Sequence, residues 1–266
     1  MRILSPELLL SGRIRMRIAG LQKLTLLDYP GEVACIVFTR GCNLRCPFCQ
    51  NPELVLPELF PAGEALTADP AEDELSERDL FEFLDRRRGK LSGVVISGGE
   101  PTVHADLPEF IARIREQGFL VKLDTNGMNP GALRGIVEES LVNYVAMDLK
   151  NSPEKYDMTC GLAPDSSLKL WRRAEESISV LMSGNVPYEF RTTVATGLHT
   201  DEDILKMAQS IRGARAWYLQ QFIDGGSLVG AEREPALRLT SPSYEDLERM
   251  RLLASEYVPA AALRGV

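Results

Sequence analysis

Six short apolar runs, each rich in β-branched or aromatic residues, alternate along the chain with segments of helical period. The runs cover residues 33–39, 92–97, 119–124, 142–148, 186–194 and 216–222, and a shorter run, 261–266, follows them. Strands that alternate with helices favour a parallel sheet whose strands are joined by right-handed helical crossovers. The pattern therefore predicts an α/β fold.

The helical segments have recognisable ends. Ser76 and Thr200 each precede a helical pattern and are followed three residues later by an acid, Asp79 and Asp203, which is typical of a helix N-terminus. Both patterns end at a glycine, as many helices do. A third pattern, residues 166–184, carries an apolar stripe that we expect to pack against the sheet: Leu168, Trp171, Ile178 and Leu181.

Length and composition are those of one folded domain. The chain has 266 residues, of which 44% are hydrophobic and 26% charged, so it can bury a sizeable core and gives no sign of disorder. We expect residues 17–266 to form a single domain and residues 1–16 to be an N-terminal extension. Residues 57–76, rich in proline, alanine and acids, are expected to form a long surface loop.

Charge and hydropathy narrow the possible partners. A formal charge of −8 argues against a general affinity for nucleic acid. The best basic run, residues 85–90, is better explained as the end of a helix capped by Gly89. No run approaches the ~18 apolar residues of a membrane span, and the N-terminal segment has too short an apolar core for a cleaved signal. We expect a cytoplasmic protein that binds neither nucleic acid nor membrane.

Three of the five cysteines, Cys42, Cys46 and Cys49, are clustered in "TRGCNLRCPFCQN", residues 39–51. An odd, clustered set fits a reducing compartment and a metal site better than a disulfide framework. The C-x3-C-x2-C spacing in a glycine-led loop lets three thiolates converge, as an iron–sulfur cluster or a zinc ion requires.

The number of ligands separates these two possibilities. A structural zinc site needs a fourth protein ligand, which His104 or His199 could supply. Cys35 could also serve, but its place in an apolar strand predicts that it points into the core. Cys160 lies far along the chain and is expected to play no part. If the site holds a cubane cluster instead, three cysteines bind three irons and the fourth iron is open to a substrate.

Polar residues follow the other predicted strands, at the ends where the active sites of parallel α/β barrels gather. They stand in residues 97–102 (SGGEPT), 124–127 (DTNG), 147–150 (MDLK), 195–199 (ATGLH) and 220–222 (QQF), with Arg191 inside the fifth strand. Each motif has an ordinary structural alternative, such as a tight turn at the glycines or an ion pair between Asp148 and Lys150. Their coincidence at every strand end favours a functional interpretation.

Together these motifs resemble a known family. The C-x3-C-x2-C loop after the first strand, with Phe48 just before the third cysteine, and GGE after the second strand resemble the radical S-adenosylmethionine (SAM) superfamily. The wider sequence, from about Met16 to the end and including "GLQKLTLLDYPG", is similar to the activating proteins of anaerobic ribonucleoside-triphosphate reductase. Those proteins are close relatives of the pyruvate formate-lyase activating enzymes.

The resemblance implies a partial (β/α)6 barrel of parallel strands with outer helices, and one 4Fe–4S cluster on Cys42, Cys46 and Cys49. The amino and carboxylate groups of SAM would chelate the fourth iron. The ammonium of SAM would be held by Glu100 and by the backbone of Gly98 and Gly99. The resemblance also gives roles to residues that would hold its carboxylate and ribose, Asp124, Asn126, Lys150, Arg191 and His199, and to two that would flank its adenine, Phe48 and Gln220.

The activity that the resemblance implies is the reductive cleavage of SAM to a 5′-deoxyadenosyl radical, which would generate a glycyl radical on a partner protein. Anaerobic ribonucleoside-triphosphate reductase is the expected partner, and a flavodoxin or ferredoxin the expected electron donor. A radical SAM enzyme acting on another glycyl radical enzyme or on a small molecule would share every motif. A zinc-stabilised binding module is a third hypothesis, but it leaves the polar strand ends unexplained.

Overall fold

The computed structural model describes residues 16–55, 75–161, 169–223, 228 and 238–265. It contains one sheet of eight strands, in which β2 to β8 are parallel and β1 is antiparallel to β2. The strands lie in chain order across the sheet: β1 Ile18–Thr25, β2 Ala34–Thr39, β3 Gly93–Gly98, β4 Leu120–Thr125, β5 Tyr144–Asp148, β6 Tyr188–Val194, β7 Trp217–Gln221 and β8 Ala261–Arg264.

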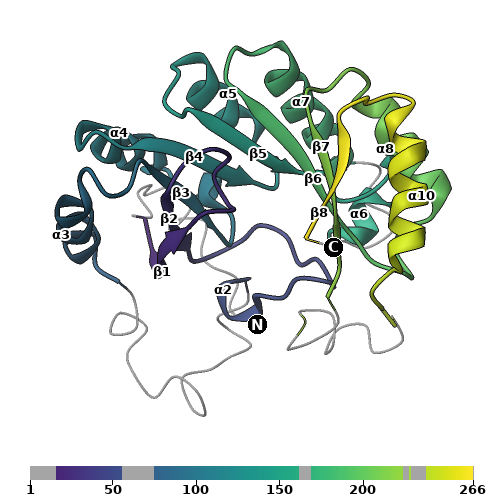
Figure 1. Ribbon diagram of the computed structural model, residues 1–266, viewed down its shortest axis with the longest axis horizontal. Coiled ribbons are helices and arrows are strands. Elements are labelled where there is room, and N and C mark those ends of the chain that lie inside the picture. Colours follow the sequence, from purple (N-terminus) through teal and green to yellow (C-terminus); the bar gives the residue numbers. More distant parts are fainter. Residues whose placement is uncertain (1–15, 56–74, 162–168, 224–227, 229–237, 266) are drawn as a thin grey trace.

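Helices connect successive parallel strands and lie on the outer side of the curved sheet (Figure 1). The main ones are α3 Glu77–Arg87, α4 Leu107–Glu116, α5 Pro130–Glu138, α7 Lys169–Ser183, α8 Asp201–Ser210 and α10 Tyr244–Ser255. Four shorter pieces, α2 Pro52–Val55, η2 Pro101–Val103, η3 Pro153–Lys155 and α6 Tyr156–Thr159, lie within the loops that follow β2, β3 and β5. None of the helices in the described segments is long and apolar enough for a membrane crossing.

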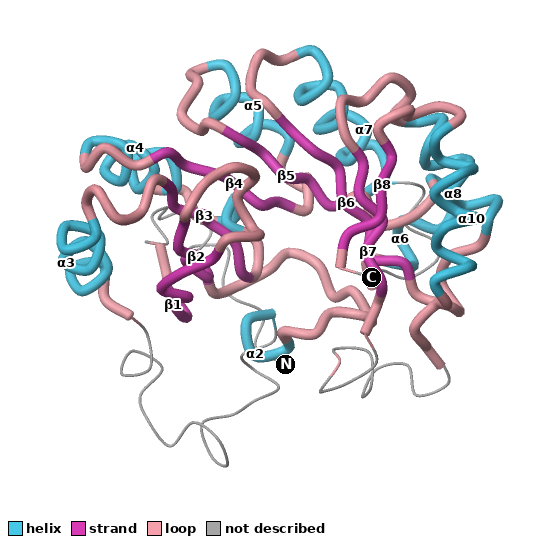
Figure 2. The backbone as a smooth tube through the Cα atoms, viewed as in Figure 1, coloured by secondary structure: helices cyan, strands magenta, loops and turns pink. Residues whose placement is uncertain are grey.

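This architecture is the predicted partial barrel. Six strand–helix units, β2 to β7 with their helices, are followed by β8, and β1 and β8 remain unpaired with each other (Figure 2). The six predicted strands are confirmed, with ends that shift by no more than two residues. β1 was not predicted. It is an edge strand whose middle residues are partly or fully exposed, so it lacks the apolar run that marks the others.

The predicted helix ends are also confirmed. The Ser76 side chain accepts a hydrogen bond from Asp79 N at the start of α3, and Thr200 and Asp203 form a reciprocal capping box at the start of α8. Gly89, just past α3, has the left-handed φ of 72° expected of its cap position.

Two predicted segments lie largely outside the described residues, namely the extension 1–16 and the loop 57–76, and they stay predictions. Leu168 of the predicted stripe lies there too, whereas Trp171, Ile178 and Leu181 are buried as expected. Met16 is described: it is buried, and its N–H donates to Asp106 Oδ2 at 2.9 Å. The domain described here therefore includes Met16.

The sheet has two different faces. Its outer face packs apolar strand residues against the helices, and Cys35 lies in this core as predicted. On the inner face, a small apolar cluster lies near the start of β2 to β5 and contains Tyr29, Ile36 and Val95. Farther along, fully buried Glu189 accepts hydrogen bonds from the guanidinium of Arg264 at 2.6 and 2.9 Å. The inner face is therefore apolar on one side and charged on the other, with the charges paired.

Candidate functional site

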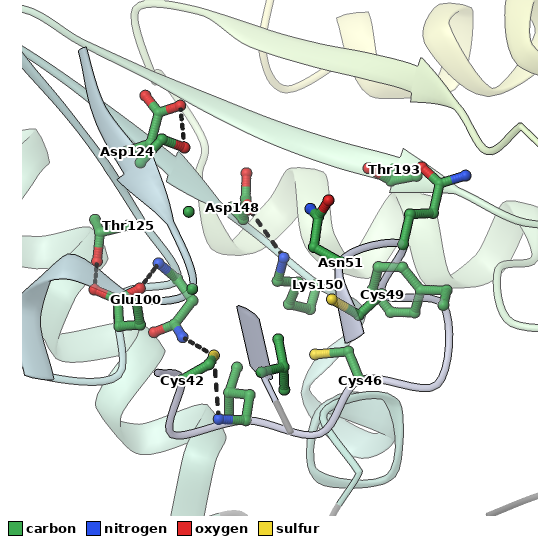
Figure 3. Close-up of a pocket in the computed structure, with 18 of the residues that line it drawn as sticks. Cys42, Cys46, Cys49, Asn51, Glu100, Asp124, Thr125, Asp148, Lys150 and Thr193 are labelled. Atoms are coloured by element: carbon green, nitrogen blue, oxygen red, sulfur yellow. Dashed lines mark hydrogen bonds and ion pairs between the residues drawn. The ribbon is translucent and has the colours of Figure 1, made fainter. Parts of the chain in front are cut away.

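A cavity of about 210 Å³ opens where the carboxyl ends of β3 to β6 meet the loop after β2 (Figure 3). Four of the six predicted motifs contribute to its lining, as does Arg191 inside β6, whereas residues 195–199 and 220–222 do not. The lining residues are Cys42, Leu44, Cys46, Phe48, Cys49, Gln50, Asn51, Val55, Ser97, Gly98, Gly99, Glu100, Asp124, Thr125, Asn126, Asp148, Lys150, Arg191 and Thr193.

The three clustered cysteines surround one end of the cavity. Their sulfurs point toward a common space from the loop after β2 (Figure 3). Cys42 Sγ accepts hydrogen bonds from Leu44 N at 3.4 Å and from Asn126 Nδ2 at 3.7 Å. Among the described residues, no three His, Cys, Asp or Glu side chains form a group that could hold a single metal ion. The three sulfurs face a shared space, but they are not placed to bind one metal ion together.

Burial and charge act on these thiols in opposite directions. Burial raises the pKa of Cys42 to about 12 and also raises the pKa of Cys49. The pKa of Cys46 is lowered, first because its sulfur accepts a hydrogen bond from the thiol of Cys160. The ammonium of Lys150 favours the thiolate at all three positions. Thiolates are the form that binds metal, so a nearby cation prepares the site for metal ligation.

The two glycines after β3 fit tightly against the cysteine loop. Gly99 N donates to Thr39 O at 2.8 Å, and Glu100 N donates to Gly41 O at 2.8 Å. A Cβ on Gly99 would lie 2.1 Å from Gly41 O, and one on Gly98, whose φ is 112°, would lie 2.3 Å from Thr39 N. Only glycine allows this approach of two backbones. The N–H groups of this turn hold the loop, while Gly98 and Gly99 also line the cavity.

The carboxylate of Glu100 is buried and surrounded by donors of the chain itself. Its Oε1 accepts hydrogen bonds from Thr102 N at 3.1 Å and from Thr125 Oγ1 at 2.7 Å, and its Oε2 accepts one from Asn126 N at 2.6 Å. Burial raises the pKa of Glu100, although these donors favour the carboxylate. Glu100 thus joins the turn after β3 to the end of β4, and its contact with an ammonium stays a prediction.

A line of alternating charges crosses the floor of the cavity from β4 to the end of β5. Asp124 forms ion pairs with Lys122 and, at 3.0 Å, with Arg191. Arg191 Nε donates to Asp148 Oδ1 at 3.0 Å, and Lys150 Nζ donates to Asp148 Oδ2 at 2.9 Å. Three cations therefore face two carboxylates, and the line carries one net positive charge.

These ion pairs set the protonation of their members. Burial would raise the pKa of Asp148, but Lys150 and Arg191 outweigh burial and lower it to about 2. The pKa of Asp124 is lowered for the same reason, by Arg191 and Lys122 against the effect of burial. Both carboxylates are therefore ionised at neutral pH. Lys150 and Arg191 keep their charge, because the neighbouring carboxylates raise the pKa of each against the effect of burial.

The remaining predicted site residues divide into two groups. Phe48 and Asn126 line the cavity, and Lys150 Nζ lies 5.7 Å from the centroid of the Phe48 ring. His199 and Gln220 are not among the lining residues. His199 Nδ1 accepts from Ala195 N at 3.1 Å, so its proton is on Nε2, which donates to Lys150 O at 2.8 Å. His199 holds the backbone of Lys150 in place.

Neither histidine completes a zinc site in the described geometry. His104 Nε2 lies 3.1 Å from Arg40 O, and His104, like His199, is absent from the cavity lining.

Two other residues, which the sequence did not assign to the site, lie in contact with site residues. Lys122 sits fully buried beside Asp124, two positions along the same strand, and Cys160, expected to play no part, lies against Cys46.

The site combines three thiols with a paired set of cations and carboxylates at the mouth of an open α/β barrel. This combination is typical of an iron–sulfur enzyme that binds a charged ligand. The chain belongs to the radical SAM superfamily, whose family model matches residues 36–211. Members of this superfamily use a 4Fe–4S cluster and S-adenosylmethionine.

Comparison with individual proteins finds relatives in sequence and in fold. A protein of Methanocaldococcus jannaschii that is named for glycyl-radical enzyme activation is 29% identical over 250 residues, covering 94% of this chain and 96% of its own. The pyruvate formate-lyase-activating enzyme of Clostridium pasteurianum is 34% identical over 140 residues, about half of each chain. A radical SAM methyltransferase of Sphaerobacter thermophilus shares the fold, with a TM-score of 0.62 at 17% identity over 91% of this chain and 68% of its own.

The donor set in the cavity fits these cofactors. Cubane clusters are held by cysteine thiolates, and three thiols that face one space leave one iron without a protein ligand. The cations of Lys150 and Arg191, which line the cavity beside them, suit the carboxylate of an amino acid. This chain therefore has the groups needed for both cofactors within one cavity.

The contact of Gly99 with the cysteine loop can be tested by Gly99→Ala. The added Cβ would meet the backbone oxygen of Gly41, which cannot rotate away, so we expect a loss of about 3 kcal/mol in the free energy of unfolding. We also expect less than half the iron of the unmodified protein after anaerobic reconstitution. Gly131→Ala is the matched control, because nothing lies within 4 Å of its Cβ position; it should match the unmodified protein, and equal iron in both variants would contradict the prediction.

The charge line predicts a pH dependence. Because the pKa of Asp148 lies below its ordinary 3.8, its carboxylate stabilises the fold above about pH 4 and loses that effect as the pH falls to about 2. Asp148→Asn should lower the free energy of unfolding at pH 7 by about 2 kcal/mol and reduce the further loss between pH 4 and 2. Urea unfolding at several pH values measures both. Asp85→Asn, in an exposed pair with Arg88, should cost less than about 1 kcal/mol, and an equal cost would refute the prediction.

Proposed function

We propose that this protein is a radical SAM activase, which uses a 4Fe–4S cluster and S-adenosylmethionine to generate a glycyl radical on a partner enzyme. The observation that carries the proposal is the cavity in which three thiols face a line of paired charges at the mouth of an open barrel. The Methanocaldococcus relative supports it, because the match covers nearly the whole of both chains.

In this proposal Cys42, Cys46 and Cys49 are the cluster ligands. When bound, the cluster and S-adenosylmethionine supply a one-electron cleavage of the sulfonium that yields methionine and a 5′-deoxyadenosyl radical, which takes a hydrogen atom from the target. Cys46 and the apolar ring of Phe48 both line the cavity and are each 7% exposed, so this part of the lining is shielded from water.

The charged residues orient the ligand. Lys150 and Arg191 offer cations to the ligand carboxylate, and Asp148 holds both of them in place before the ligand arrives. Binding therefore orders few additional side chains. Gly98 and Gly99 line the cavity, and their carbonyl oxygens would accept from the ligand ammonium.

The open side of the barrel suits a protein substrate. β1 and β8 do not pair, so the inner face is not enclosed by strands on every side. A glycine-bearing loop of a partner could enter there, whereas a closed eight-stranded barrel is filled by its own side chains. From the sequence resemblance we propose anaerobic ribonucleoside-triphosphate reductase as the partner and a flavodoxin or ferredoxin as the electron donor.

Anaerobic reconstitution tests the radical chemistry. The unmodified protein should bind about four irons per chain and, with dithionite and S-adenosylmethionine, release 5′-deoxyadenosine. Cys46→Ala should lose the cluster and the cleavage, because a ligand is removed. Cys35→Ala, which changes a buried cysteine of the core, should retain both. Failure of the unmodified protein to release 5′-deoxyadenosine would refute the proposal.

The partner is tested by electron paramagnetic resonance. The reconstituted protein is incubated anaerobically with purified anaerobic ribonucleoside-triphosphate reductase or with pyruvate formate-lyase, in the presence of reductant and S-adenosylmethionine. We expect a glycyl-radical signal on the reductase, and none with the Cys46→Ala variant. A signal on pyruvate formate-lyase alone would reassign the partner. Cleavage of S-adenosylmethionine with no signal on either protein would favour a small-molecule substrate.

A further inference from the structure

Lys122 is a lysine buried inside the barrel. It stands in β4 between Val121 and Leu123, whose side chains belong to the outer core. Because side chains alternate along a strand, Lys122 points to the inner face, where it is only 1% exposed. Its neighbours across the sheet are Val95 of β3 and Tyr144 of β5, which belong to the small apolar cluster. Burying an ammonium in such surroundings is costly unless it is paired.

The partner of Lys122 is the carboxylate of Asp124. Lys122 Nζ donates to Asp124 Oδ1, whereas Asp124 Oδ2 accepts from Arg191 Nη1 at 3.0 Å and from Ser97 Oγ at 3.2 Å. The two cations therefore bind different oxygens of one carboxylate. Asp124 and Arg191 line the cavity, but Lys122 does not. Lys122 thus touches Asp124 without touching the cavity.

This contact changes how Arg191 is shared between carboxylates. Arg191 also donates to Asp148, which pairs with Lys150. Without Lys122, two cations would face two carboxylates, and Asp124 would have Arg191 as its one cationic partner among the described residues. With Lys122 present, the charge of Asp124 is balanced by a second cation. Arg191 therefore keeps a stronger attraction for a further carboxylate.

We propose that Lys122 is a positioning residue for the binding of the SAM carboxylate: it compensates the charge of Asp124, so that Arg191 stays available to the ligand. The inference rests on the proposed function in one respect, namely that SAM occupies this cavity. Lys122 does not touch the ligand. Its charge still acts there, because buried charges are screened much less than charges in water.

The test measures the binding of SAM to the anaerobically reconstituted protein by equilibrium dialysis, without a reductant, so that no cleavage occurs. Lys122→Met, which keeps the length of the side chain and removes its charge, should raise the Kd for SAM about tenfold. Lys122→Arg, which keeps the charge, should stay within about threefold of the unmodified protein. Lys23→Met, the same change at an exposed lysine of β1, should leave the Kd unchanged.

A second ligand separates this role from a general effect on the fold. Decarboxylated SAM keeps the ammonium and the sulfonium but lacks the carboxylate, so Lys122→Met should bind it no more weakly than the unmodified protein does. A merely structural role would weaken the binding of both ligands equally, and that result would overturn the inference. An unchanged Kd for SAM in Lys122→Met would overturn it as well.

Lys122→Gln covers the case in which an apolar residue beside Asp124 prevents folding. Its amide can donate to Asp124 but carries no charge, so this variant should also bind SAM about tenfold more weakly. Affinity equal to that of the unmodified protein would show that a hydrogen bond suffices, and the inference would fail. If the unmodified protein itself did not bind SAM, the proposed function would fail instead, so the two failures are distinguishable.

Discussion

The close contact between the turn after β3 and the loop after β2 is the constraint on which the site depends. Gly99 and Glu100 donate to two backbone oxygens of the loop, and no residue larger than glycine fits at Gly99. The carboxylate of Glu100 then joins this turn to the end of β4. Three successive strand ends are thereby fixed relative to one another, and the direction of the cysteine side chains follows from that.

A second constraint is electrostatic. The inner face of the sheet carries buried charges that would be costly if unpaired. Lys122 pairs with Asp124 of its own strand, and Arg191 and Arg264 each pair with an acid two strands away. Asp124 and Asp148 each pair with cations on two sides, so each member of the line is held by its neighbours. Of these cations, Lys150 and Arg191 line the cavity, where they can meet an anionic group of a ligand, whereas Lys122 does not line it.

Much of this could be predicted from the sequence, and the exceptions have physical causes. The parallel strands were predictable because buried strands are continuous apolar runs, whereas β1 was not, because an edge strand is exposed along much of its length. The cysteine loop and the GGE turn were predictable from local spacing. The direction of a side chain at a strand end could not be predicted. His199 bonds to the backbone of Lys150, and the carboxylate of Glu100 accepts hydrogen bonds from other residues of the chain.

Contacts between segments that are distant in the chain could also not be predicted from the sequence. Lys122 lies in an apolar run, where a lysine more often reaches solvent, and its pairing with Asp124 depends on both facing the inside of the barrel. The contact of Cys160 with Cys46 depends on the path of the chain after β5, which no local pattern records. The predicted convergence is therefore confirmed for four motifs and Arg191 but not for residues 195–199 and 220–222, and the partner of each side chain had to come from the structure.

The hydrogen bonds that hold the cysteine loop come from the turn after β3, from Asn126 after β4 and from the segment around Cys160, all of them groups of the protein. Loops of this kind differ from zinc fingers, in which the metal is what folds the chain. Here the hydrogen bonds of the chain itself hold the cysteine loop in its described shape. We therefore expect the loss of an iron–sulfur cluster to oxygen to leave the barrel folded, so that iron and sulfide can restore the cluster without new synthesis of the protein.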